Sequence, residues 1–364
     1  MTEGEALDHW LSNRNSVIWH SSFVLRHSLD IPSFDIRHSH DWSTCMPINF
    51  MTTYRGSLLE NFYPKGWDFA RIDACCGMGP KKLLKPGKHW NREFKPVTVK
   101  SVAEMDKKMG DAIAGQIIAA KKKGRALALI LPVGPMGMYK HTVAAIKKAK
   151  ITCDHVHTFN MDEWSDRDGN TFPGNQVGGF EHAMGEALFK PLGKYTVPKS
   201  QRNFATQTNL STYPGKIAAI KQAGGRLVTV YGIGRACHIA FWEPQIAGEY
   251  ATVDEWKSQP FRIGQPLHPL TVEQNALHSF NSRFTLIPCF ANSIGPGLFL
   301  QSDFCIGGAD GAYPDRGAMW QGMSLCVTLQ YGNDPWIPSS WMPTMPGRLF
   351  FMKQLAGPLL PEAH

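Results

Sequence analysis

A helical pattern that alternates with short, wholly apolar strand patterns occupies the middle of the chain, and it limits the possible folds more than any other feature. A capping box at 101–104 begins a helix whose apolar residues recur every four positions up to Ile117. Residues 126–131 are then continuously apolar, which is typical of a strand buried on both faces of a parallel sheet. A Gly-rich turn follows and leads into a second helical pattern that runs through Ile146.

The same alternation continues downstream and predicts the fold class. Further strands are expected at 154–159 and 227–231, with a helix at 217–222 that ends at two consecutive glycines. Strands that alternate with helices favour an α/β fold, here a Rossmann-like, mostly parallel sheet with helices on both faces. Ligands of such sheets bind beyond the carboxyl ends of the strands, so we expect a site at these positions.

The two flanking regions differ from the middle in composition. Residues 1–95 lack sustained helical periodicity and are rich in His, Trp, Pro and Gly, and residues 331–364 combine two tryptophans with several prolines. We therefore expect an irregular N-terminal extension at 1–95 packed on the core, an α/β domain at 96–330, and an irregular C-terminal tail at 331–364. The tryptophans of the tail predict that it too packs on the core.

Composition excludes several classes of protein. Of the 364 residues, 43% are hydrophobic and 19% are charged, which rules out a disordered chain. No apolar run approaches the ~18 residues of a membrane span, and the acidic start is unlike a signal peptide, so we expect a cytoplasmic protein without membrane contact. The net charge of +8 lies partly in lysine clusters. We assign them to solvated helix ends rather than to nucleic-acid binding, with steering of an anionic substrate as the alternative.

Three strand ends have residues suited to chemistry, and each has a plain structural alternative. The turn 133–137 enters a helix, where exposed amides and the helix dipole would attract an anion, or it is an ordinary βα turn. Asp162 and Glu163 follow the second strand, where they could hold a general base in a cleft, unless Asp162 caps the next helix. His238 and Glu243 follow the third, where the carboxylate would orient the imidazole, unless His238 is a packed structural residue.

Two of these segments resemble a known family. The stretches Phe159-Asn-Met-Asp-Glu-Trp164 and His238-Ile-Ala-Phe-Trp-Glu-Pro244, the second after a Gly-x-Gly strand end, look like glucosamine-6-phosphate deaminase, also called glucosamine-6-phosphate isomerase. The order of elements agrees as well, over roughly residues 96–330. The wider superfamily includes phosphogluconolactonase-like relatives.

The resemblance implies an activity and a role for each residue. Members convert glucosamine 6-phosphate and water to fructose 6-phosphate and ammonia without metal or organic cofactor, and we expect a homo-oligomer that binds a small phosphosugar. Asp162 would be the base that moves a proton between C2 and C1, His238 the acid/base of ring opening, and Glu243 the group that holds His238. The residues expected to contact the phosphosugar are Val133, Gly134, Pro135, Met136, Gly137, Glu163, Arg283 and Arg316.

Two departures from the family pattern affect these expectations. Ala236 stands where the family usually has a catalytic carboxylate, so ring opening is expected to limit the rate and Ala236→Asp to raise kcat. The alternative is that Asp310 or Asp315 has taken over this role, in which case the added acid would slow the enzyme. The turn 133–137 also lacks the family's hydroxyl side chains, and Pro135 has no amide N–H to donate.

Other functions remain alternatives. They are an aldose–ketose isomerase without deamination, a lactonase that acts on a phosphosugar acid, and a sugar-phosphate-binding regulatory protein that has lost catalysis. The presence of Glu243 speaks against the lactonase, whose relatives usually lack it, and Ala236 is evidence for the loss of catalysis. The stretches His38-Ser-His40-Asp41 and His155-Val-His157 have ligand-like spacing. We predict no metal at either.

Overall fold

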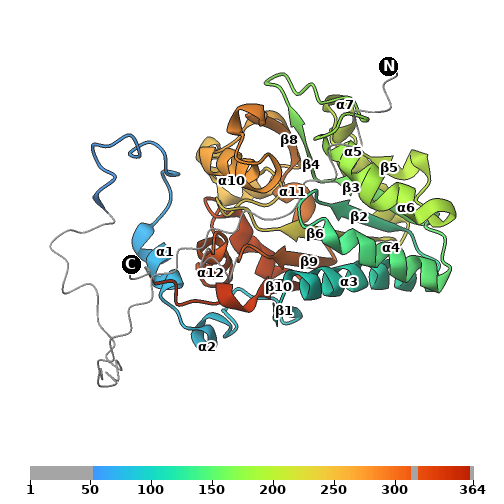
Figure 1. Cartoon of the computed structure of the whole chain (residues 1–364), viewed down its shortest axis with the longest axis horizontal. Coiled ribbons are helices and arrows are strands. Elements are labelled where there is room, and N and C mark those ends of the chain that lie inside the picture. The colour runs from blue at the N-terminus through green and yellow to red at the C-terminus, as the bar shows by residue number, and fades with distance from the viewer. Residues whose placement is uncertain (1–51, 313–318, 361–364) are drawn as a thin grey trace, which may run out of the picture. The chain divides into compact units, whose positions relative to one another are not determined.

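The computed structural model describes residues 52–312 and 319–360, and its core is a parallel sheet (Figure 1). Seven strands form this sheet in the order β1-β10-β9-β6-β2-β3-β5, and each neighbouring pair is parallel. The strands are β1 (Phe94–Val99), β2 (Leu127–Leu131), β3 (Val156–Asn160), β5 (Arg202–Asn203), β6 (Arg226–Gly232), β9 (Phe304–Ala309) and β10 (Gly347–Met352). The predicted α/β fold with a mostly parallel sheet is thus confirmed.

The helices that cover the sheet begin and end close to the predicted positions. The helix α3 (Val102–Lys122) has Ser101 as its N-cap, whose side chain accepts the Glu104 N–H at 3.2 Å. It packs against α4 (Gly137–Ala149), while α8 (Tyr213–Gln222) packs against β2 and β6. All five residues of β2 are buried, as expected for a strand covered on both faces.

A second, smaller sheet was not predicted. The strands β4 (Asp162–Ser165), β8 (Phe290–Ile294) and β7 (Phe261–Pro266) pair antiparallel in the order β4-β8-β7. Because β4 follows β3 after a single residue, Met161, the chain passes directly from one sheet to the other at Asp162. The shorter helices around the two sheets are α5 (Phe180–Met184), α6 (Lys190–Leu192), α7 (Gln207–Leu210), α9 (Val253–Ser258), α10 (Pro269–Ser279), α11 (Pro296–Phe299) and α12 (Gly322–Gln330).

The C-terminal tail contributes a strand where the sequence predicted irregular structure. The strand β10 lies between β1 and β9 and is buried along most of its length. The segment before β1 contains α1 (Phe69–Cys76) and α2 (Pro80–Leu83), and it is hydrogen-bonded to the end of the chain. Trp67 Nε1 donates to the Trp336 carbonyl at 2.9 Å, and Trp90 Nε1 donates to the Leu329 carbonyl at 2.8 Å. The division of the chain at residues 95 and 330 stays a prediction.

Two further features concern charge and membranes. Lysines of two of the clusters lie in the last turns of helices, Lys121 and Lys122 in α3 and Lys147 and Lys148 in α4. This agrees with the assignment of the clusters to helix ends. Within residues 52–312 and 319–360, no helix is both long and apolar enough to cross a bilayer.

Candidate active site

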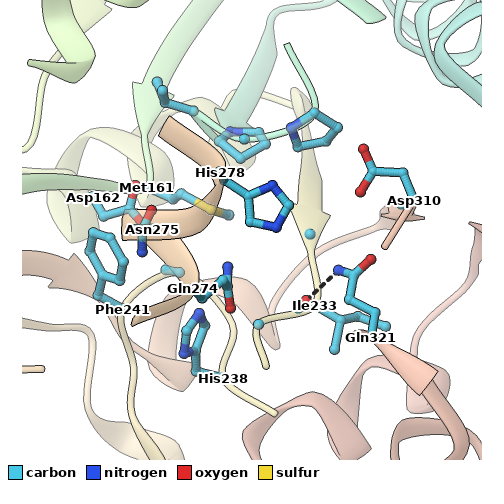
Figure 2. Close-up of a pocket in the computed structure, with 18 of the residues that line it drawn as sticks. Met161, Asp162, Ile233, His238, Phe241, Gln274, Asn275, His278, Asp310 and Gln321 are labelled. Carbon is cyan, nitrogen blue, oxygen red and sulfur yellow. Dashed lines mark hydrogen bonds between the residues drawn. The ribbon is translucent and has the colours of Figure 1, made fainter. Parts of the chain in front are cut away.

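A cavity of about 240 Å³ lies where the carboxyl ends of β2, β3, β6 and β9 meet, and α10 forms another wall (Figure 2). This is the position expected of a ligand site in a parallel α/β sheet. The strand-end residues on its walls are Val133, Gly134, Pro135, Asp162, Gly234, His238 and Asp310. The structure therefore brings Asp162 and His238, which lie far apart in the sequence, to one cavity.

Asp162 is the first residue of β4 and is 6% exposed. Burial raises the pKa of its carboxyl well above the ordinary range, and the neighbouring Glu163 carboxylate adds to the shift. A carboxyl in such a place holds its proton more tightly than an aspartate in water. Once ionised it is a stronger base, as a group that removes a proton from carbon must be.

Glu163 points away from the cavity and caps a helix. Its two side-chain oxygens accept the Phe180 N–H at 2.9 and 2.8 Å, and one of them accepts the Glu181 N–H at 2.9 Å, so the carboxyl sits at the start of α5. Burial raises the pKa of Glu163 to about 7, although these hydrogen bonds oppose the shift. The sequence suggested a helix cap as the alternative for Asp162, but it is Glu163 whose carboxyl lies at a helix start, and this position gives no support to a contact of Glu163 with substrate.

His238 and Glu243, which the sequence suggested could pair, lie within hydrogen-bond distance of each other and are both buried. The His238 Nδ1 and Glu243 Oε2 atoms are 3.1 Å apart, and Glu243 is fully buried. The other carboxylate oxygen, Oε1, accepts the backbone N–H of His268 at 3.3 Å. A carboxylate at Nδ1 favours the tautomer in which Nδ1 holds the proton, so Nε2 is the ring nitrogen left to exchange protons with a ligand.

The loop that presents His238 is sterically constrained. Cys237 and Ala240 have φ values of 61° and 55°, in the left-handed region that costs energy for residues with a Cβ. A Cβ on Gly234 would collide with Nε2 of His238, so only glycine fits beside the ring. Ala236 is fully buried in this loop and does not line the cavity.

The turn after β2 is only partly open to the cavity. Val133, Gly134 and Pro135 line it, whereas Met136 and Gly137 do not. A Cβ on Gly137 would collide with the carboxylate of Asp106, a buried residue of α3. An acidic side chain of the protein therefore already lies against the first residue of α4, where the sequence suggested that a phosphate would bind.

The cavity wall contains no lysine or arginine among the residues that the structure describes. Arg283 is exposed, in the turn that follows α10, and does not line the cavity. Arg316 and Asp315 lie outside the described residues. The titratable residues on the wall are Asp162, His238, His278 and Asp310.

Several residues on α10 were missed by the sequence analysis. Gln274, Asn275 and His278 line the cavity, and Thr271 lies one turn earlier on the same helix. The spacing i, i+3, i+4, i+7 places all four on one helical face. That polar stripe was the available signal, although polar stripes more often face solvent than a site.

The cavity wall also has a second histidine, His278, and a second aspartate, Asp310. The ring of His278 packs against that of Trp320, with 4.4 Å between the ring centroids. Burial lowers the pKa of His278 and raises the pKa of Asp310. Each shift favours the uncharged form, so this wall has less charge than its residue types suggest.

The two stretches with ligand-like spacing can be compared with the described residues. The described residues contain no cluster of three His, Cys, Asp or Glu side chains that could hold an ion. His155 Nε2 is 2.9 Å from the Ile117 carbonyl, a contact that satisfies this nitrogen. The stretch His38–Asp41 lies outside the described residues.

Curated proteins with similar sequences are named glucosamine-6-phosphate deaminase. The protein from Clostridium acetobutylicum is 29% identical over 219 residues, which cover 57% of this chain and 79% of the relative. The protein from Caenorhabditis elegans is 30% identical over 185 residues, which cover 50% of this chain and 63% of the relative. No family model matches the chain.

Solved structures with a similar fold come from two kinds of enzyme. A monomeric glucosamine-6-phosphate deaminase superposes with a TM-score of 0.56 at 16% identity, over 72% of this chain and 98% of that one. A 6-phosphogluconolactonase from Trypanosoma cruzi superposes with a TM-score of 0.50 at 13% identity, over 74% and 98% of the two chains. At these identities the likeness concerns the fold alone.

Proposed function

We propose that this chain converts glucosamine 6-phosphate and water to fructose 6-phosphate and ammonia. Its curated relatives confirm its resemblance to the glucosamine-6-phosphate deaminase family. The observation on which the proposal depends is the meeting of Asp162 and the His238–Glu243 pair at one cavity. The reaction needs two kinds of proton transfer, at ring oxygens and at carbon. The cavity offers a separate group for each.

Ring opening is assigned to His238. Nε2 takes the proton from the C1 hydroxyl and returns it to the ring oxygen as the C1–O5 bond breaks, which leaves an open-chain aldehyde. Glu243 stabilises the imidazolium that exists between the two transfers, because its carboxylate accepts the Nδ1 proton. Gly234 leaves the space that the ring needs.

Isomerisation is assigned to Asp162. Its carboxylate removes the proton from C2 and returns it to C1, while O1 takes the proton that the substrate's ammonium group gives up, so the amino aldehyde becomes an iminium at C2 with a CH₂OH group at C1. Water adds to C2, the C2–N bond breaks, and ammonia leaves with the ketone as product. The buried setting of Asp162 strengthens the carboxylate as a base, which supports this role.

The test is an assay of ammonia release from purified protein, with glucosamine 6-phosphate as substrate and fructose 6-phosphate measured in parallel. Equal amounts of the two products are expected. Three control substrates separate the alternatives: glucose 6-phosphate for an isomerase without deamination, 6-phosphogluconolactone for a lactonase, and unphosphorylated glucosamine for the role of the phosphate. Binding of glucosamine 6-phosphate without turnover of any substrate would instead identify a regulatory protein and contradict the proposal.

A further inference from the structure

The imidazole of His238 has a second polar neighbour besides Glu243. Thr271 Oγ1 lies 3.0 Å from His238 Nδ1, the same nitrogen that Glu243 Oε2 approaches at 3.1 Å. Thr271 is fully buried, and among the described residues its hydroxyl has no other hydrogen-bond partner. No sequence motif connects the two residues, since Thr271 lies on α10 and His238 on the loop after β6.

A hydroxyl at this position can do what a carboxylate cannot. When His238 Nδ1 holds a proton, this N–H can donate to both the Thr271 hydroxyl oxygen and the Glu243 carboxylate, as a bifurcated hydrogen bond. When Nδ1 has lost it, the hydroxyl can turn and donate its own proton to the bare nitrogen. An ionised carboxylate only accepts, so it cannot donate to the bare nitrogen.

The first turn of α10 holds Thr271 in place. The His268 side chain accepts the Leu270 N–H at Nδ1, 3.1 Å away, and its Nε2 lies 2.8 Å from the carbonyl of Phe62. The first contact needs a bare Nδ1 and the second needs a proton on Nε2, so both are satisfied by neutral His268, and burial lowers its pKa. The His268 backbone N–H meanwhile donates to Glu243. One helix turn thus fixes both partners of His238.

We propose that Thr271 is a positioning residue for His238, and that it supplies the second Nδ1 partner that a carboxylate in place of Ala236 would otherwise provide. The inference rests on the proposed function for its catalytic consequence, but the contact with Nδ1 is independent of it. Two titratable groups near the ring are Glu243 and His268, and among the described residues no hydrogen bond joins either of them to Thr271 Oγ1.

The experiment compares Thr271→Val, which keeps the shape and removes the hydroxyl, with Thr271→Ser, which keeps the hydroxyl. The control is Thr142→Val, at a buried threonine of α4 whose hydroxyl contacts only backbone carbonyls, at 3.2 and 3.3 Å. The imidazole ¹⁵N shifts of His238 are read in histidine-labelled protein and assigned by their absence in His238→Gln. The kcat and KM for glucosamine 6-phosphate are measured alongside.

We expect Thr271→Val to move the two ring ¹⁵N shifts of His238 toward each other and to lower kcat about five- to tenfold, with KM within about twofold. Thr271→Ser should restore both readouts, and Thr142→Val should change neither. Unchanged ¹⁵N shifts in Thr271→Val, or a failure of Thr271→Ser to restore them, would overturn the proposal. If Thr271→Val does not fold, Thr271→Ala is read in the same way. Altered shifts in a protein that releases no ammonia would uphold the positioning role and contradict the proposed function instead.

Discussion

The His238 end and the 133–137 end of the cavity are built in different ways. At the first end, His238 has two buried side-chain partners, Glu243 and Thr271, at 3.1 and 3.0 Å. At the second, the turn after β2 has lost hydroxyls and one amide, and the Asp106 carboxylate lies against Gly137. The group that we propose for ring opening is thus held by buried hydrogen-bond partners, whereas a carboxylate lies against the turn where the resemblance implied an anion.

The difference has a physical reason. A proton transfer needs particular atoms within hydrogen-bond reach of the reacting atoms, so few replacements are tolerated. An anion, by contrast, can be bound by amides, imidazolium or distant positive charge, and many arrangements suffice. We therefore expect substitutions at the His238 end, and at Asp162 beside it, to affect kcat strongly. Substitutions at the turn should instead affect affinity, and more mildly.

The largest effect is expected for Asp162→Asn, which removes the proposed base and keeps its shape. Ammonia release should fall by about 10²–10⁴-fold, while the affinity for glucosamine 6-phosphate measured by calorimetry stays within a few-fold. Because burial raises the pKa of Asp162, the acidic limb of kcat/KM in the wild type should lie above the ordinary aspartate range. Retention of more than about a tenth of the rate would exclude Asp162 as the base.

The direction in which Asp162→Asn changes the free energy of unfolding can be predicted, and it serves as a folding control. Asp162 keeps its proton to a higher pH in the folded protein than in the unfolded one, so its ionisation lowers the free energy of unfolding as pH rises above its unfolded pKa. Asparagine does not ionise. At pH 7 the variant should therefore be at least as stable as the wild type in a urea titration, and a less stable variant would mean that Asp162 also has a structural role.

A smaller loss is expected for Gly234→Ala, which tests how tightly the His238 end is packed. The added Cβ would collide with Nε2 of His238 and must displace the ring, so kcat/KM should fall about ten- to a hundredfold. Gly232→Ala is the matched control. It lines the same cavity on the same strand end, but its Cβ would meet only Pro135, at 3.9 Å. Equal losses in the two variants would show that the position of His238 is not what matters.

At the 133–137 end of the cavity we predict a gain in affinity for phosphate-containing ligands rather than a loss of activity. Asp106→Asn removes a carboxylate beside the first residue of α4, so glucosamine 6-phosphate and inorganic phosphate should bind about three- to tenfold more tightly. Burial raises the pKa of Asp106, so the difference between wild type and variant should grow as pH rises and the wild-type carboxyl ionises. Asp111→Asn is the control, because Asp111 is exposed on the same helix and pairs with Lys107 at 2.6 Å. Equal binding by all three proteins would exclude a phosphate near this turn.

The parts of the fold that the sequence predicted are those with an unbroken local pattern. The strand β2 is a continuous apolar run, β6 is buried along most of its length, and Ser101 caps α3 as its spacing indicates. The strand β10 was missed because prolines on its N-terminal side made the tail look irregular. The strand β4 begins with two acids, and an acidic pair does not resemble a buried strand until a partner such as β8 is known.

The residues of the candidate site also show that only local patterns can be read from the sequence. Asp162, His238 and Glu243 were found because they lie in two short motifs. Thr271 and His278 lie in no motif, and they reach the site only because α10 packs beside the β6 loop. Contacts between distant segments depend on how the helices and strands pack together. The spacing of residues within one segment cannot predict that packing.

The smallest effect is expected for Ala236→Asp, the substitution that restores the family's missing carboxylate. The sequence suggested a rise in kcat, or a fall if Asp310 has taken over the role. Figure 2 shows Asp310 on a part of the cavity wall away from His238. The structure provides Thr271 at Nδ1 instead. With Glu243 and Thr271 already at this nitrogen, a third acceptor has little left to stabilise, and we expect kcat to change by less than about threefold.

The double variant of Ala236→Asp and Thr271→Val tests why that effect is small. If the two side chains serve the same nitrogen, the new carboxylate should recover most of the kcat that Thr271→Val loses, although it does little in the wild type. Stability must be followed in parallel, because Ala236 is fully buried and a carboxyl there is desolvated. A rise of tenfold or more in the single variant would mean that ring opening is limited by the missing acid and that Thr271 does not replace it. Additive effects in the double variant would mean that the two positions act on His238 independently.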